Sequence, residues 1–114
     1  MHEVALAQGV LDTVLKEAAR HGGGHIPEIR LRVGRLSRVA PESLQLAFEA
    51  LSRGTCAEGA KLLIEPVPLR VRCRSCQAES EVAPERMVCP ACGGREVEVV
   101  AGMDLLLESF ELQE

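Results

Sequence analysis

Four cysteines in two Cys-x-x-Cys pairs carry the clearest chemistry of this sequence: Cys73 with Cys76 and, after twelve further residues, Cys89 with Cys92. Two such pairs can place four thiolates at the corners of one tetrahedron, and Zn(II) favours four soft ligands in that geometry. A site closed by four thiolates leaves no open position for a substrate. We therefore expect a structural zinc site, with a rubredoxin-like iron site as the alternative for the same ligands.

The surroundings of these cysteines agree with a metal site. Gly93 and Gly94 follow the second pair directly, so the backbone can fold tightly under the metal and point its amides at the sulfurs. The fifth cysteine, Cys56, stands alone, and we expect a small buried thiol there. Paired Cys-x-x-Cys motifs without a recognisable signal peptide indicate a reducing compartment, so a cytoplasmic protein is expected.

The composition excludes several classes of protein. With 114 residues, 46% of them hydrophobic, the chain forms one globular domain or a small domain with a metal module. Its formal net charge is −4, and it contains two Phe but no Tyr or Trp, which argues against binding nucleic acid. No run of about eighteen apolar residues is present, so no membrane span is expected.

Two helices are predicted to carry much of the core. Over residues 3–20, apolar side chains recur at steps of three and four, and Gly22-Gly23-Gly24 then ends the helix. The stripe comprises Val4, Ala7, Val10, Leu11, Val14, Leu15 and Ala18. A second helix is expected to begin at Pro41, which suits a first helical turn, and to end before Gly54.

Three strands are predicted. Residues 29–33 alternate between apolar and charged side chains, which indicates a sheet covered on one face only. Residues 62–71 contain Pro66 and Pro68, neither of which can donate a ladder hydrogen bond, so we expect an edge strand. Residues 103–112 are apolar on both faces, which favours a central position under the helices. The last two strands flank the cysteines and are expected to pair with each other.

These elements predict an α+β fold in which a small α/β domain carries two helices on a three-stranded sheet. The domain comprises residues 1–69 and 98–114, and residues 70–97 form an inserted four-cysteine domain that resembles a zinc ribbon.

The first three residues, Met1-His2-Glu3, form a second candidate metal site. A free α-amine, the amide nitrogen of His2 and its Nδ1 can close chelate rings around one ion. Such tetragonal nitrogen donors favour Ni(II) or Cu(II) over zinc, and Glu3 can add its amide nitrogen or its carboxylate. A lone histidine in this position is nevertheless more often solvated and uninvolved.

At this point the sequence resembles the HypA/HybF family of hydrogenase nickel-incorporation proteins over nearly its whole length. The motifs that carry the resemblance are Met1-His2-Glu3 before an amphipathic helix, Val33-Gly34-Arg35-Leu36-Ser37, Val39-Ala40-Pro41-Glu42-Ser43-Leu44, Ala47-Phe48-Glu49, Gly54-Thr55, Glu58-Gly59-Ala60, the four cysteines with Pro90 and Gly93, Gly102, and Glu108-Ser109-Phe110-Glu111. The cysteines alone are generic, whereas their combination with the first three residues is specific.

The resemblance implies a nickel metallochaperone that serves the maturation of NiFe hydrogenase and is not an enzyme. The family's transient Ni(II) ligands then correspond to His2, with Met1 and Glu3 contributing through the backbone, and its structural Zn(II) ligands to the four paired cysteines. The implied partners are the GTPase HypB and the precursor of the hydrogenase large subunit, and the chain is a monomer or a homodimer. Arg38 and Ala40 depart from many relatives, so whether their loop adds a nickel donor stays open.

The alternative is a zinc-ribbon module that binds protein or nucleic acid and has no nickel function. The acidic charge balance and the scarcity of aromatic residues count against nucleic acid.

Overall fold

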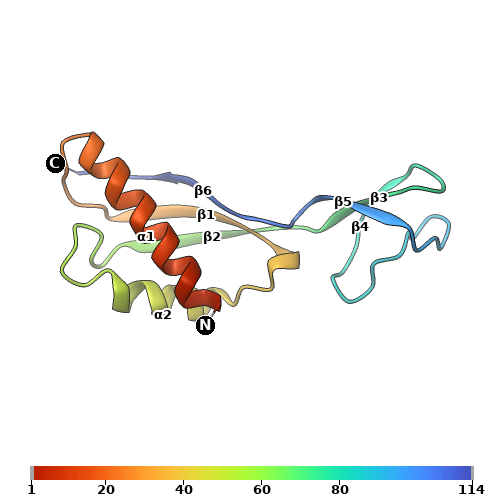
Figure 1. Cartoon of the computed structure of the whole chain (residues 1–114), viewed down its shortest axis with the longest axis horizontal. Coiled ribbons are helices and arrows are strands. Elements are labelled where there is room, and N and C mark those ends of the chain that lie inside the picture. Colours follow the sequence, from red (N-terminus) through yellow and green to blue (C-terminus); the bar gives the residue numbers. More distant parts are fainter. Residues whose placement is uncertain (1, 114) are drawn as a thin grey trace. The chain divides into compact units, whose positions relative to one another are not determined.

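The computed structural model describes residues 2–113 and has the α+β architecture expected (Figure 1). Its elements are α1 (His2–Arg20), β1 (Glu28–Gly34), the 3-10 helix η1 (Arg35–Ser37), α2 (Pro41–Leu51), β2 (Lys61–Val67), β3 (Arg70–Cys73), β4 (Glu79–Glu81), β5 (Val97–Ala101) and β6 (Leu105–Phe110). The strands form two three-stranded sheets, with the orders β2-β1-β6 and β4-β3-β5.

The chain divides into two compact units. The first comprises Met1–Leu31, Val39–Glu65 and Leu107–Glu114, and the second comprises Arg32–Arg38 and Pro66–Leu106. The predicted boundaries of an inserted domain, at residues 70 and 97, stay a prediction. No helix within residues 2–113 is long and apolar enough to cross a bilayer.

The core of the first unit forms where α1 and α2 pack against each other (Figure 1). The predicted stripe of α1 is buried at Ala7, Val10, Leu11, Val14 and Ala18, although Val4 at its start is 40% exposed. In α2, Pro41 occupies the first turn, and Leu44 and Phe48 are fully buried one turn apart. The helical periodicity therefore predicted these two elements correctly.

Strand β1 is the middle strand of its sheet. Ile29, Leu31 and Val33 are buried, whereas the intervening Arg30 and Arg32 are exposed, as the alternation predicted. Strand β2 lies at one edge, which confirms the position expected from its prolines.

The prediction of a central strand over residues 103–112 is wrong, because β6 is the other edge of the sheet. Some of its apolar side chains are exposed rather than buried. Leu106 is 57% exposed, and Met103 just before the strand is 54% exposed.

The prediction of a single strand over residues 62–71 is also wrong. The chain breaks at Pro68 and Leu69, so β2 and β3 belong to different sheets. Pro68 cannot donate a ladder hydrogen bond, and it lies between the two strands. The predicted pairing between residues 62–71 and 103–112 does not form, because β1 separates β2 from β6. Instead β3 pairs antiparallel with β5, a strand that the periodicity did not reveal.

The second unit has a small core and a close backbone crossing. Only Leu69, Val71 and Val82 form its buried cluster. Half-buried Leu36, Met87, Val97 and Val99 pack around them. At the crossing, a Cβ on Gly102 would lie 2.6 Å from the carbonyl oxygen of Pro68, so only glycine fits there.

Candidate metal centre

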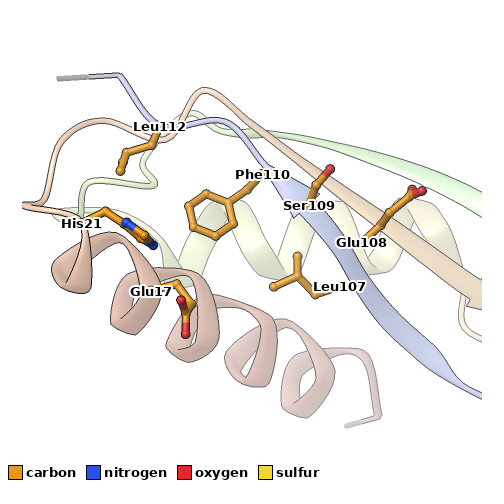
Figure 2. Close-up of a pocket in the computed structure, with 7 residues that line it drawn as sticks. All are labelled: Glu17, His21, Leu107, Glu108, Ser109, Phe110 and Leu112. Carbon is orange, nitrogen blue, oxygen red and sulfur yellow. The ribbon is translucent and has the colours of Figure 1, made fainter.

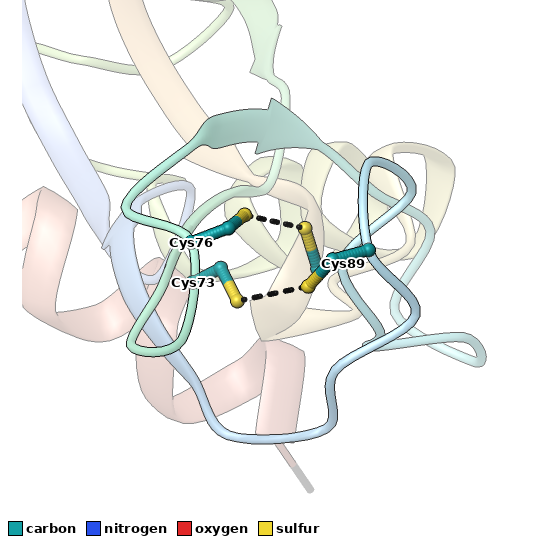
Figure 3. Close-up of side chains that lie close together, drawn as sticks. Cys73, Cys76 and Cys89 are labelled. Atoms are coloured by element: carbon teal, nitrogen blue, oxygen red, sulfur yellow. Dashed lines mark hydrogen bonds between the residues drawn. The ribbon is translucent and has the colours of Figure 1, made fainter.

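The four paired cysteines lie together in the second unit (Figure 3). The Sγ atoms of Cys73 and Cys92 are 3.6 Å apart, as are those of Cys76 and Cys89, and all four lie within 4.8 Å of one another. Four thiolates about 2.3 Å from one Zn(II) have tetrahedral edges of about 3.8 Å. All four are free thiols, so the spacing and the donor set both fit a zinc ion.

The first cysteine loop is a tight turn closed by two backbone hydrogen bonds. The N–H of Gln77 donates to the carbonyl oxygen of Cys73 (2.9 Å), and the N–H of Cys73 donates to that of Ala78 (2.9 Å). Gln77 takes a left-handed backbone conformation to make this turn, with φ of 67°.

The second loop repeats this geometry at the same spacing. Gly93 donates to the carbonyl oxygen of Cys89 (2.7 Å), and Cys89 donates to that of Gly94 (2.8 Å). Gly93 has φ of 77°, so it occupies the position that Gln77 occupies in the first loop. The two Cys-x-x-Cys pairs thus form matching loops that present their sulfurs to one point, and only one of them has glycine at the left-handed residue.

Gly94 lies directly against the sulfurs. A Cβ built on it would be 3.3 Å from the Sγ of Cys92 and 3.4 Å from that of Cys73. The expectation that the backbone folds tightly under the cysteines at this position is therefore confirmed.

The four cysteines differ in exposure. Cys73 and Cys89, the first residue of each pair, are buried, whereas Cys76 and Cys92 are exposed. Each pair therefore contributes one inner and one outer thiol. Cys56 is half-buried in the first unit, less buried than we predicted, and belongs to no cluster of three or more possible ligands among residues 2–113.

Backbone N–H groups favour ionisation of the two inner thiols. The hydrogen bond from the backbone of Cys76, supported by that from Ser75, lowers the pKa of Cys73 to about 6 against the effect of burial. The corresponding hydrogen bond from the backbone of Cys92 lowers the pKa of Cys89. In both loops, the backbone of the second cysteine thus lowers the pKa of the first cysteine.

The outer thiol of Cys92 behaves in the opposite way. The backbone N–H of Gly94 acts to lower its pKa, but the thiols of Cys73, Cys76 and Cys89 together with burial outweigh this and raise the pKa to about 12. Four neighbouring thiolates repel one another, so full ionisation of the cluster needs a cation among them. This electrostatic need is the one that a divalent metal ion meets.

Two arginines beside the cysteines, Arg72 and Arg74, form ion pairs with glutamates. Arg72 forms ion pairs with Glu79 (3.1 Å) and Glu98 (3.8 Å), and Arg74 approaches Glu98 at 3.7 Å. These arginines therefore do not form the uncompensated basic surface that a nucleic-acid-binding zinc ribbon needs.

The predicted nickel site is described only in part. Met1 lies outside the described residues, and for His2 the structure describes the backbone alone, as the first residue of α1. The carboxylate of Glu3 accepts an exposed hydrogen bond from the backbone N–H of Ala40, with 3.4 Å between Oε2 and N. Thirty-seven positions separate the two residues, and no local pattern in the sequence indicated this contact.

Comparisons with known proteins agree on one family. The family model described as "Hydrogenase/urease nickel incorporation, metallochaperone, hypA" matches residues 1–112. The hydrogenase maturation factor HypA of Chlorobaculum tepidum is 43% identical, over 99% of this chain and 100% of its own length. That of Desulfitobacterium hafniense is 39% identical over the full length of both chains.

Solved structures agree on the fold. The solution structure of the Ni metallochaperone HypA from Helicobacter pylori matches with a TM-score of 0.70 at 21% identity, over 98% of this chain and 97% of that one. A second solution structure of a HypA protein matches with a TM-score of 0.73 at 22% identity, over 99% and 97%. The chain belongs to the HypA family of hydrogenase maturation factors, which are nickel metallochaperones and not enzymes.

Proposed function

We propose that this chain binds Ni(II) through Met1, His2 and Glu3 and delivers it to the precursor of a NiFe hydrogenase large subunit. The α-amine of Met1, the amide nitrogens and the imidazole of His2 supply the nitrogen donors that Ni(II) favours.

The observation that carries this proposal is the hydrogen bond from Ala40 to the carboxylate of Glu3. It connects the first turn of α1 to the residue before α2. The amide nitrogens of a first helical turn have no partner within the helix, so those of His2 and Glu3 are free to bind a metal ion. Because the carboxylate is already engaged, we infer that Glu3 contributes to nickel through its backbone nitrogen.

We propose further that Zn(II) is held by Cys73, Cys76, Cys89 and Cys92 and has a structural role. The sulfur spacing and the closed set of four donors support a site with no exchangeable position. We propose that the residues around it, 70–97, act as a rigid platform for a partner, for which HypB and the large-subunit precursor are the candidates. Five free thiols fit action in the reducing cytoplasm.

The test of the nickel site is a titration of zinc-loaded, nickel-free chain. We expect one Ni(II) per native chain, and loss of that ion in His2→Ala and in a chain whose α-amine is acetylated. His21→Ala is the matched control, because His21 is an exposed histidine at the other end of α1 and should leave nickel binding unchanged. Unaltered nickel binding by both terminal variants would overturn the proposed site.

Delivery needs a separate measurement. Nickel-loaded chain is mixed with metal-free large-subunit precursor, with and without HypB, and the nickel content of each separated protein is followed. We expect nickel to move from the native chain to the precursor. The His2→Ala variant, incubated with nickel and freed of unbound ion in the same way, should deliver none. Equal transfer from free nickel salt and from the loaded chain would contradict a delivery role.

A further inference from the structure

An open hollow of about 720 Å³ lies between the last turns of α1 and strand β6 (Figure 2). Half-buried Leu107, Phe110 and Leu112 supply its apolar lining, and Glu108 and Ser109 of the same strand also line it. Figure 2 shows Leu107 and Phe110 on the side of α1, where Glu17 and His21 form the opposite wall. All of these residues belong to the first unit.

The strand beside this hollow has an unpaired edge. Within residues 2–113, β6 has β1 on one side and no strand on the other. Glu111 donates its N–H to Glu28 (3.0 Å), and Gln113 donates its own to His25 (2.7 Å). Successive residues of an extended chain direct their backbone groups to opposite sides, so Leu112 presents its N–H and carbonyl oxygen to the open side. Unpaired backbone groups of this strand are therefore available for hydrogen bonding beside the hollow.

The two edges of this sheet differ in how they are protected. Strand β2 at the far edge contains Pro66, which cannot donate a backbone hydrogen bond to another strand. Residues 103–114 contain no proline, and β6 begins with three successive leucines. An edge without proline keeps its backbone groups available to a further strand.

The negative charge of this strand favours a positively charged binding partner. Residues 103–114 carry four carboxylates and no lysine or arginine. Glu108 is exposed and has no ion-pair partner within 4.0 Å among the described residues, whereas Glu17 on the helix already pairs with Arg20 (3.0 Å). In Figure 2, Glu108 points to the side of the strand away from α1. A strand added beside β6 would thus meet the apolar side chains of the hollow and the carboxylate of Glu108, which also lines a second hollow together with Arg30.

We propose that the edge of β6 and this hollow bind an extended basic segment of a partner protein, which adds to the sheet as a fourth strand. Alternate residues of the segment are apolar and fill the hollow over Phe110. The residues between them are lysine or arginine and lie beside Glu108. This mode of recognition combines main-chain hydrogen bonds with pockets for every second side chain. It is independent of the proposed nickel site and involves neither metal.

The test uses a defined probe on the full zinc-loaded chain. Acetyl-Val-Lys-Val-Lys-Val-Lys-Val-amide is titrated to about 1 mM while backbone amide shifts are followed by NMR. We expect saturable shifts confined to residues 107–113 and His21. The corresponding peptide with glutamate in place of lysine should bind about tenfold more weakly, because like charges then face each other across the strands.

Two pairs of variants test the role of the Glu108 charge and the role of the Leu112 backbone N–H separately. Glu108→Lys should weaken binding of the lysine peptide about fivefold or more, whereas Glu49→Lys, a change at another exposed glutamate on α2, should not. Leu112→Pro removes the open-edge N–H together with the side chain, and Leu112→Ala removes the side chain alone. The proline variant should bind more weakly than the alanine variant.

Several outcomes would overturn the proposal. These are the absence of saturable shifts, equal binding of the two peptides, and equal binding by Glu108→Lys and Glu49→Lys. Shifts of residues 107–113 that depend on the concentration of the chain alone would assign the edge to a second copy instead. Because Glu108 is an exposed surface residue, its variants keep the test decisive even where Leu112→Pro fails to fold.

Discussion

The carboxylate of Glu3, in the first turn of α1, accepts a hydrogen bond from the backbone N–H of Ala40, the residue that precedes α2. Ala40 is the N-cap of α2 and offers no side chain that could accept a hydrogen bond from the helix. The contact therefore joins the starts of two helices that are distant in sequence.

The first prediction concerns this contact. Glu3→Ala should lower the free energy of unfolding of the zinc-loaded chain by about 1 kcal/mol, because a hydrogen bond between the helix starts is lost. Glu3→Gln keeps an acceptor oxygen and should cost less than about half of that. Urea unfolding followed by circular dichroism measures both. Glu42→Ala, in the first turn of α2, is the control, and equal losses for Ala and Gln at position 3 would contradict the hydrogen-bond explanation.

The second prediction follows from the matching cysteine loops. Gln77 has the left-handed conformation that Gly93 adopts at the equivalent position, so Gln77→Gly should stabilise the second unit by up to about 1 kcal/mol. The gain is reduced by loss of the hydrogen bond from its side chain to the carbonyl oxygen of Arg74 (3.1 Å). The converse change, Gly93→Gln, should destabilise the unit by about 1 kcal/mol.

Thermal unfolding of the zinc-loaded variants checks this pair. If Gly93→Gln left the stability unchanged, the left-handed backbone conformation at this position would not favour glycine as we infer.

The third prediction is a pH dependence of zinc binding. In the metal-free chain the pKa of Cys73 is lowered to about 6 and that of Cys92 is raised to about 12. Between these values Cys92 keeps its proton until zinc displaces it, so binding releases protons and the affinity rises with pH. Below pH 6 Cys73 is protonated as well, and the affinity should fall more steeply.

Calorimetric titration in two buffers of different ionisation enthalpy counts the protons released. At pH 7 we expect at least one proton per zinc ion, from Cys92. Zinc binding without proton release at that pH would show that the cluster is already fully ionised.

The fourth prediction concerns removal of the metal. The second unit buries only Leu69, Val71 and Val82 in its cluster, which is a small core for its size. A zinc chelator should therefore unfold this unit while the helices of the first unit persist, because their core does not depend on the cysteines. Amide NMR spectra report the loss residue by residue, and far-ultraviolet circular dichroism reports the helices. Cys56→Ser is the control and should respond to the chelator as the native chain does.

Much of the fold was predictable because it depends on local patterns. The apolar residues of α1 recur with helical spacing, Pro41 suits the first turn of α2, and β1 alternates between buried and charged side chains. The spacing of the four cysteines likewise predicts convergence of their sulfurs, because each pair closes its own loop. The resemblance to the HypA family was carried by motifs of this local kind. The nickel ligands Met1, His2 and Glu3 stay a prediction.

Other features were decided only by the tertiary structure. The apolar pattern of residues 103–112 cannot distinguish a central strand from an exposed edge, because either can be rich in leucine. The order of strands depends on which distant segments pair, and β1 takes the middle position. The contact between Glu3 and Ala40 spans residues that no local pattern connects. The sequence by itself thus determined which elements form and which thiols can share an ion. The tertiary structure decided which edge of the sheet stays open and where the first turn of α1 is held, because both depend on contacts between segments far apart along the chain.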